Sequence, residues 1–143
     1  MGIALAEVRD SAVTAAELLD LVRRPDAGAV ALFVGVVRDH DPQASGAVVS
    51  LDYTCHPSAP QRIREIVADV LASTDPGDDC TVAAVHRIGH LVVGDVAFVV
   101  AVSAAHRQPA FAVCEQVVEA VKAGLPVWKQ QFEADGSYRW SGL

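Results

Sequence analysis

The segment from Ala29 to Arg38 (AVALFVGVVR) limits the fold more than any other, because it is an almost unbroken apolar run that ends in a charge. Valine and phenylalanine favour extended backbone, and an apolar run without polar alternation fits a buried strand. The apolar segments from Cys80 to Ile88 and from Val96 to Ser103 predict two further strands. The chain is therefore expected to build its core around a sheet.

Three segments have the capping signals or apolar spacing of helices. Thr14-Ala15-Ala16-Glu17 has the form of a capping box and predicts a short helix that runs to about Arg24. The segment Ser58-Ala59-Pro60-Gln61 can cap a second helix, in which apolar residues recur at helical spacing. The third helix is expected to start near Pro109, since a first helical turn tolerates proline, and to end at Gly124.

Shorter segments predict the remaining strands: Ile3 to Val8, Ala47 to Tyr53, Val127 to Glu133 and Tyr138 to Trp140. The last two are expected to form a hairpin around Ala134-Asp135-Gly136. The segment from Gly89 to Asp95 is expected to be only a connection, with Gly94-Asp95 as its turn. Strands mixed with about three helices predict one α+β domain over residues 1–143, with a mostly antiparallel sheet.

The composition excludes several classes of function. A net charge of −7 argues against nucleic acid or an anionic membrane as a partner, because both require a basic surface. No apolar run reaches the roughly 18–20 residues needed to cross a bilayer. The first residues lack the features of a secretory signal, so we expect a cytoplasmic protein. Cys55, Cys80 and Cys114 form no CxxC pair, so we expect small buried side chains and neither a zinc site nor a disulfide framework.

Lysine is rare in this chain, which has nine arginines but only Lys122 and Lys129. Unlike a guanidinium, an amine can lose its proton and act as a nucleophile or base. The two lysines flank Gly124-Leu125-Pro126, which reverses the chain, so they could face one another. Two close ammonium groups disfavour each other's charge and lower a pKa. We therefore take both as candidate catalytic residues, although two solvated lysines surviving by chance would give the same count.

Cationic groups follow three of the expected strands: Arg38 with His40, His86 with Arg87, and His106 with Arg107. Such side chains can converge on one cleft, although any strand must end in something polar. His106 and Arg107 are the strongest pair, because they precede the third helix, whose free N–H groups and dipole favour an anion.

The third helix separates His106 from Lys122. They lie at its opposite ends, about 15 residues and roughly 20 Å apart along the axis. They cannot share a pocket within one chain unless the helix is curved or interrupted. One solution is a dimer, in which His106 and Arg107 of one subunit reach the lysines of the other.

Six elements of the sequence occur in an order and at a spacing typical of one protein family. They are Phe33 to His40 (FVGVVRDH), Val85 to Gly89 (VHRIG), Gly94-Asp95, Ser103 to Arg107 (SAAHR), Lys122, and Pro126 to Lys129 (PVWK). Together they resemble the large catalytic subunit of molybdopterin synthase, the MoaE family, over about residues 28 to 140.

This resemblance implies an α/β hammerhead-like fold and a reaction. The family belongs to molybdenum cofactor biosynthesis and converts cyclic pyranopterin monophosphate to molybdopterin by installing the two dithiolene sulfurs. The sulfur is carried as a thiocarboxylate on the C-terminal Gly-Gly of a small ubiquitin-like subunit of the MoaD type. The resemblance therefore implies a sulfurtransferase without a cofactor or metal. It also implies a central homodimer with a small subunit at each end, which is a heterotetramer.

The family's active-site lysines correspond to Lys122 and Lys129 of this sequence. Lys122 would be the nucleophile or acid/base at the carbons that receive sulfur, and Lys129 would hold the thiocarboxylate or the substrate. Which of the two is the nucleophile stays open. The expected substrate-binding residues are Arg38, His106 and Arg107 as anion ligands, Val36, Val37, Gln130 and Gln131, and Arg139 near the pocket.

Two other functions fit parts of the sequence. A thiol-dependent transferase could use Cys55 if the fold placed the ring of His56 on its sulfur, but neighbours on a strand point to opposite faces. A non-catalytic module could bind an anionic metabolite in the same cationic pocket. Lys122→Arg separates the module from the synthase, because a sensor keeps much of its binding whereas the synthase binds and loses turnover.

Overall fold

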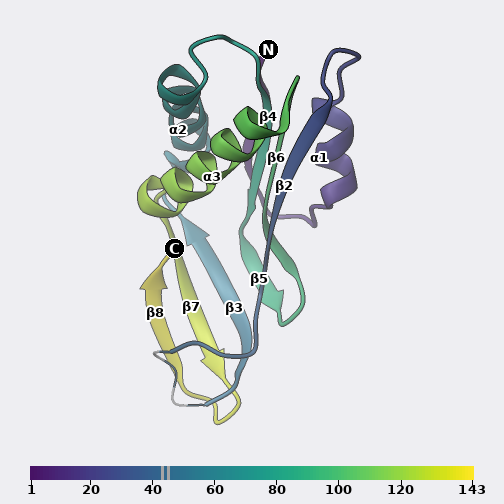
Figure 1. The fold of residues 1–143 in the computed structure, drawn as a ribbon. Coiled ribbons are helices and arrows are strands. Elements are labelled where there is room, and N and C mark those ends of the chain that lie inside the picture. Colours follow the sequence, from purple (N-terminus) through teal and green to yellow (C-terminus); the bar gives the residue numbers. More distant parts are fainter. Residues whose placement is uncertain (43, 45) are drawn as a thin grey trace.

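Three helices and eight strands form in the described residues, 1–42, 44 and 46–143, of the computed structural model. In chain order they are β1 (Gly2–Arg9), α1 (Ala15–Val22), β2 (Ala29–Val36), β3 (Val48–Cys55), α2 (Ala59–Thr74), β4 (Thr81–Arg87), β5 (Gly89–Val92), β6 (Val96–Ala104), α3 (Arg107–Gly124), β7 (Val127–Glu133) and β8 (Tyr138–Gly142). The strands form two sheets of four, and all three helices pack against the first sheet (Figure 1).

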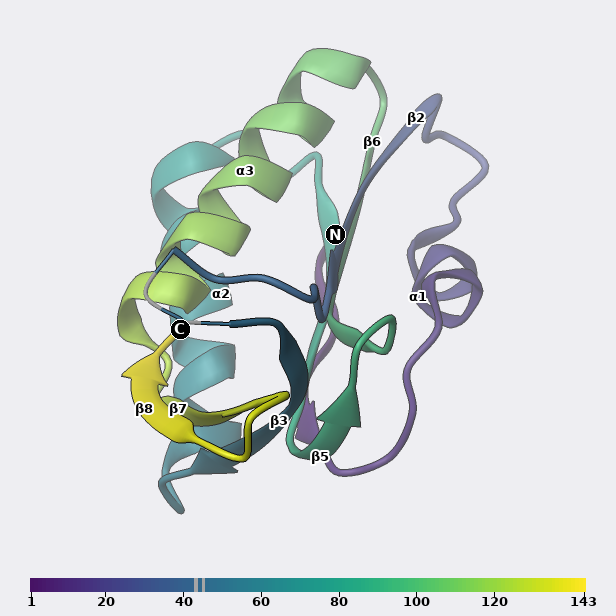
Figure 2. The ribbon, with the colours of Figure 1, turned by 90° about the horizontal axis from the view of Figure 1, so that it is seen from below.

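The first sheet has the strand order β1-β4-β6-β2. Its β1–β4 pair is parallel and its other pairs are antiparallel. Figure 2 shows α2 and α3 on one side of this sheet and α1 on the other, so its central strands are covered on both faces. This explains the unbroken apolar sequence of β6, in which every residue from Ala97 to Ala104 is buried. The strand β2 was expected to be buried, but it lies at the edge of the sheet and every second residue from Val30 to Val36 is exposed, so that prediction was wrong in part.

The second sheet has the order β5-β3-β7-β8 and is antiparallel throughout. The α+β class, the helices and the mostly antiparallel pairing predicted from the sequence are confirmed, but the strands divide into two sheets. Gly89 begins β5 with a φ of 95°, a conformation that favours glycine and turns the chain from one sheet into the other.

The segment predicted to be only a connection contains the strand β5, so that prediction was wrong in part. Leu91 pairs with Leu51 across the β3–β5 ladder and is fully buried in a small cluster with Val37. This long-range contact stabilises the strand. The turn at Gly94, with a φ of 95°, is where the sequence indicated it.

The helix ends follow the predicted signals in part. At α1 the capping box is present, because the Glu17 backbone N–H donates to the Thr14 hydroxyl and the Thr14 N–H donates to the Glu17 carboxylate. At α2 the side-chain cap is absent, because the Ser58 hydroxyl is hydrogen-bonded to Nδ1 of His56 instead. The third helix ends at Gly124 as predicted. Within the described residues, no helix is long and apolar enough to span a membrane.

Candidate active site

A pocket of about 260 Å³ opens where the end of β2, the C-terminal end of α3 and the second sheet meet. Its lining is mostly polar and contains both lysines. The residues that line it are Val36, Val37, Arg38, His40, Asp41, Leu51, Tyr53, Lys122, Lys129 and Gln131.

Backbone hydrogen bonds hold in place the part of the pocket wall that follows β2. The strand β2 ends at Val36, two residues before its predicted end, because Val37 leaves the sheet for the turn between β5 and β6. The Val37 N–H donates to the carbonyl of Asp95 at 2.9 Å, and the Gly94 N–H donates to the carbonyl of Val37 at 2.8 Å. These two hydrogen bonds fix the backbone from which Arg38 enters the pocket.

The second sheet supplies the floor through alternation along β3 and β7. Lys129 is paired with Tyr53, and Gln131 is paired with Leu51. Because alternate residues of a strand share one face, these four side chains lie on the pocket side. Gln130, predicted to bind substrate, lies between them in sequence and is outside the pocket lining.

Lys122 lies in the last turn of α3, at the rim of the pocket. The residue as a whole is exposed, but partial burial of its amine lowers the pKa, and the charges of Lys129 and Arg38 lower it further. The carboxylate of Glu119 acts in the opposite direction. From the sequence, the neighbouring ammonium was the expected cause of such a shift, whereas in the structure burial lowers the pKa of Lys122 most.

Lys129 has a carboxylate beside it. Its Nζ lies 4.0 Å from Oδ2 of Asp41, and the two side chains are only 22% and 15% exposed. With Arg38 and Lys122, Lys129 gives the pocket three cationic side chains. Such a set can hold an anionic ligand and offers an amine that gives up its proton more readily than an ordinary lysine.

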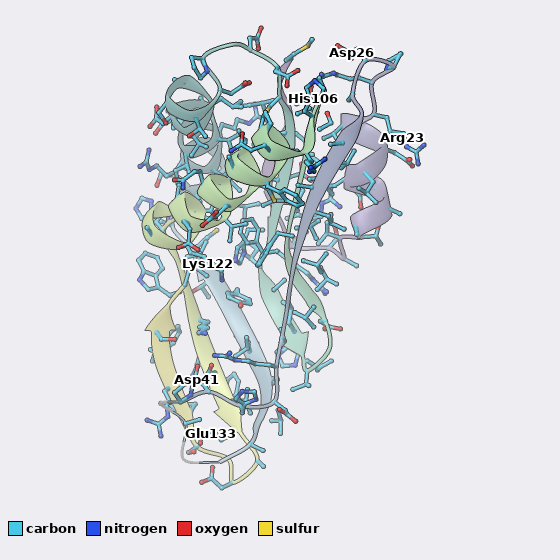
Figure 3. All side chains as sticks on the ribbon, in the orientation of Figure 1. Arg23, Asp26, Asp41, His106, Lys122 and Glu133 are labelled. Atoms are coloured by element: carbon cyan, nitrogen blue, oxygen red, sulfur yellow. The ribbon has the colours of Figure 1, made fainter. Side chains whose placement is uncertain are left out.

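His106 and Arg107 do not reach this pocket in the same chain. Figure 3 shows His106 and Lys122 at opposite ends of α3. The helix begins at Arg107, and the 15 residues from there to Lys122 span about 22 Å at the usual helical rise. The expected separation within one chain is therefore observed.

Within one chain, the three cationic strand ends do not meet in one pocket. Arg38 and His40 line the pocket, but Arg87 forms an ion pair with Asp95 at 4.0 Å. The side chain of His86 is buried, with 2% exposure, because it shares the core face of β4.

His86 lies behind the pocket wall. Its ring centroid is 5.1 Å from that of Tyr53 and 5.3 Å from that of Phe98. Because a carbonyl only accepts, the 2.8 Å contact with the Arg87 carbonyl means that Nδ1 carries the proton. Burial, and then the charge of Lys122, lower the pKa of His86 to about 4, so the ring is neutral near pH 7.

Arg139 is also outside the pocket lining. Its Nε donates to Oε2 of Glu133 at 3.3 Å. The Glu133 side chain is almost fully buried and also accepts from the Gly46 N–H at 2.8 Å and the Ser137 hydroxyl at 3.2 Å. Glu133 therefore fastens the β7–β8 hairpin to the loop before β3, and Arg139 pairs with Glu133 within the hairpin.

The cysteines show no arrangement for thiol catalysis. Nδ1 of His56 is hydrogen-bonded to the Ser58 hydroxyl at 2.8 Å and accepts from the Ser58 N–H at 3.1 Å, which ties the ring to Ser58. Burial raises the pKa of both Cys80 and Cys114 to about 11, so their thiols stay protonated. The described part of the chain also contains no group of three or more histidine, cysteine or acidic residues placed to hold a metal ion.

Comparison with known proteins identifies the family. The family model described as MoaE protein matches residues 8–124. This chain belongs to the MoaE family. The resemblance seen in the sequence is confirmed, and with it an enzyme of the molybdopterin synthase type, a sulfur-transferring activity of molybdenum cofactor biosynthesis.

Individual MoaE relatives cover nearly the whole chain. Molybdopterin synthase catalytic subunit 1 of Mycobacterium tuberculosis is 35% identical over 133 residues, which are 93% of this chain and 87% of that protein. The crystal structure of molybdopterin synthase from Staphylococcus aureus matches with a TM-score of 0.82 at 25% identity, over 96% of this chain and 97% of that one. A complex of subunits 1 and 2 of molybdopterin-converting factor from Helicobacter pylori shares the fold, with a TM-score of 0.73, 18% identity, and coverage of 96% and 90%.

The pocket contains residues that the sequence argument did not select. Asp41, Leu51 and Tyr53 line it, although none was named as a site residue. Tyr53 was identified only as the end of a strand, and Asp41 only as part of a polar loop. Neither residue carries a local signal, because each reaches the pocket through pairing or loop closure with distant segments.

Proposed function

We propose that this chain transfers sulfur from the C-terminal thiocarboxylate of a small ubiquitin-like partner to cyclic pyranopterin monophosphate, forming the dithiolene of molybdopterin. The observation that carries the proposal is the pocket in which Lys122, Lys129 and Arg38 meet. The pterin carries a phosphate and the donor carries an anionic thiocarboxylate, so both reactants require cationic ligands. Cysteine is absent from the described residues of the pocket lining, which agrees with a sulfur brought in by the partner.

The two lysines have different roles in this proposal. The lowered pKa of Lys122 makes the free amine more abundant, so Lys122 serves as the nucleophile or acid/base at the carbons that receive sulfur. Lys129, beside Asp41, serves as a charge that holds the thiocarboxylate or the substrate. Arg38 binds the phosphate, for which a guanidinium is well suited.

The functional unit in this proposal is a homodimer that pairs through the free edge of β2, with one small subunit at each pocket. Four alternate residues of this strand form an apolar row whose members are between 36% and 51% exposed: Val30, Leu32, Val34 and Val36. An edge strand also has backbone N–H and C=O groups that can pair with another strand. An exposed apolar row on such an edge is well suited to a second copy of the same strand.

Antiparallel pairing of two β2 strands would complete the site. It places the end of one strand, which leads to Arg38, beside the beginning of the partner's strand. That beginning lies next to the segment before α3, since Ala29 pairs with Ala104 and a side chain on Gly28 would lie 2.8 Å from the carbonyl oxygen of Ala105. Eight strand residues span about 26 Å, close to the length of α3 between its ends. The partner's His106 and Arg107 would thus approach the pocket.

Reconstitution tests the proposed reaction. The protein would be incubated with a thiocarboxylated small partner and cyclic pyranopterin monophosphate, and the product analysed by mass spectrometry for the added sulfur. Molybdopterin is expected from the wild type, and a loss of at least about a hundredfold from Lys122→Ala or Lys129→Ala. Arg62→Ala, on the surface of α2, is the matched loss of a positive charge outside the pocket and is expected to stay active. The absence of product with a competent partner would overturn the proposal.

A further inference from the structure

Gln131 and Tyr53 bring neutral polar groups to the lining of the pocket. Gln131, from β7, is buried, with only 5% exposure, and Tyr53, from β3, is partly buried. Among the described residues, nothing forms a hydrogen bond with the Gln131 carboxamide or with the Tyr53 hydroxyl. Because burial takes polar groups away from water, two such groups in a pocket indicate a ligand that hydrogen-bonds to them.

The ladder between β3 and β7 sets the distance between these two side chains. Tyr53 is paired with Lys129 and Gln131 is paired with Leu51, so Tyr53 and Gln131 are diagonal neighbours on the pocket face of the sheet. Diagonal neighbours of an antiparallel pair lie about 7–8 Å apart, within reach of aromatic and long side chains. Both groups can therefore contact one small ring that lies on the floor of the pocket.

The phenol of Tyr53 is held from behind by His86. The two rings make an edge-to-face contact, with centroids 5.1 Å apart and an angle of 80° between their planes. His86 is itself buried and also contacts Phe98. Burial raises the pKa of Tyr53, so its hydroxyl keeps its proton and can donate near pH 7. A fixed neutral donor of this kind is suited to an uncharged group of a ligand.

The cationic side chains of the same pocket are suited to a different part of a ligand. Lys122, Lys129 and Arg38 attract an anion, and phosphate forms its strongest hydrogen bonds with charged donors. The Gln131 carboxamide instead has a donor and an acceptor side by side. This pattern complements the N3–H and the C4 carbonyl of a pterin ring, whereas it neutralises none of the charge of a phosphate.

We propose that Gln131 and Tyr53 form a subsite that recognises the pyrimidine edge of the pterin, separate from the cations that hold its phosphate. The Gln131 carboxamide accepts from N3–H and donates to the C4 carbonyl, and the Tyr53 hydroxyl donates to another acceptor of the ring. The inference rests on the proposed function, because the pterin is the substrate named there. No covalent bond changes at this subsite, so both residues act on binding.

Binding to the full-length protein, without the small partner, tests the subsite. Calorimetry would measure the Kd for cyclic pyranopterin monophosphate and, separately, the Kd for inorganic phosphate. Gln131→Met removes the carboxamide with little change of volume, and Tyr53→Phe removes only the hydroxyl. Each variant is expected to raise the Kd for the pterin at least about fivefold and to leave the Kd for phosphate unchanged.

The chain offers a matched control for each variant. Gln130→Met makes the same change at the preceding residue, which is outside the described lining of the pocket. Tyr138→Phe changes the other of the two tyrosines in the chain, which is 60% exposed on β8 and also outside that lining. Both controls are expected to bind the pterin as the wild type does.

A wild-type Kd for the pterin in either Gln131→Met or Tyr53→Phe, with an intact fold by circular dichroism, would overturn the proposal. An equal loss of phosphate binding would also overturn it, because it would show general damage to the pocket. Should Gln131→Met fail to fold, Gln131→Leu is judged by the same criteria. In the sulfur-transfer assay, the two variants are expected to raise KM for the pterin with kcat within about twofold of the wild type. A lower kcat at unchanged KM would place these residues in the chemical step and refute the subsite.

Failure of the subsite and failure of the proposed function give different results. If the wild type does not bind the pterin, the proposed substrate is wrong, and the subsite is refuted with it. If the wild type binds the pterin and the variants bind it equally well, the subsite alone is refuted. Neither result depends on turnover.

Discussion

The length of α3 has a consequence that can be tested by mixing two inactive variants. The helix places Lys122 about 22 Å from the residues that precede its first turn, so in the proposed dimer His106 would serve a different active site from the Lys122 of its own chain. His106→Ala and Lys122→Ala should then each inactivate every site of their own homodimer. A hybrid dimer of the two variants should regain one intact site, built from Lys122 of one subunit and the partner's His106.

The expected recovery follows from counting sites. Random exchange of subunits makes about half of the dimers hybrids, and each hybrid has one intact site and one site with both defects. The mixture should therefore reach about a quarter of wild-type turnover, and purified hybrids about half. If the two residues served the same pocket of one chain, every site would carry a defect, and activity would stay at the level of the parents.

The assay would use two affinity tags to purify the hybrids and would measure dithiolene formation with a thiocarboxylated partner. Lys122→Ala mixed with Lys129→Ala is the matched control, because both residues line the pocket of one chain. Every site of that hybrid lacks one lysine, so no recovery is expected. Recovery in the control, or none in the His106 and Lys122 hybrid when both parents dimerise, would refute the shared site.

Three further predictions concern the pocket and the core. Lys122→Arg should keep anion binding, measured by calorimetry, but its turnover should fall at least about a hundredfold. A turnover within a few fold of the wild type would show that the reaction does not need Lys122 to lose its proton. Burial lowers the pKa of His86 from 6.5 to about 4, so between these pH values the unfolded chain binds more protons than the folded chain. The free energy of unfolding, measured by urea denaturation, should therefore fall by about 3 kcal/mol as the pH drops from 6.5 to 4. His86→Phe should make this dependence shallower, and an unchanged slope would contradict the assignment. Thr14→Ala should remove the capping box of α1 and cost about 1 kcal/mol of unfolding free energy at unchanged activity, and equal urea midpoints would show that the cap is not stabilising.

The elements that could be predicted are those whose signal is local. The apolar runs of β4 and β6 reflect burial on both faces, and Thr14 with Glu17 marks the start of α1 within four residues. The strand β5 has no such signal, because it exists through the pairing of Leu91 with Leu51, which lies far away in the sequence. The Ser58 hydroxyl could hydrogen-bond either to a backbone N–H at the start of α2 or to His56. Local geometry decides that it pairs with His56.

The site residues also divide into those that the sequence indicates and those that only long-range contacts place. Lys122 and Lys129 were found because a composition of nine arginines and only two lysines is unusual. A buried histidine and a cationic histidine at a strand end look alike in sequence, and contacts with Tyr53 and Phe98 decide that His86 is the former.

Asp41 and Arg139 show why composition and family pattern could not complete the site. Asp41 lies beside Lys129 only because its loop closes near β7. Arg139 forms an ion pair with Glu133 on the neighbouring strand, a contact that depends on the register of the β7–β8 hairpin. Lys129 lies far from Asp41 in the sequence, and the hairpin signal near Arg139 does not fix the register that pairs it with Glu133.

The most direct test of the central claim follows the sulfur itself. A small ubiquitin-like partner would be prepared with a heavy sulfur isotope in its C-terminal thiocarboxylate and mixed with this protein and cyclic pyranopterin monophosphate. The mass of the product would show the origin of its dithiolene sulfurs. Sulfur transfer in the lysine pocket predicts that both sulfurs are heavy, in the wild type and in Cys55→Ala alike. A product without the heavy isotope, or failure of Cys55→Ala to transfer the heavy sulfur, would contradict sulfur transfer in the lysine pocket.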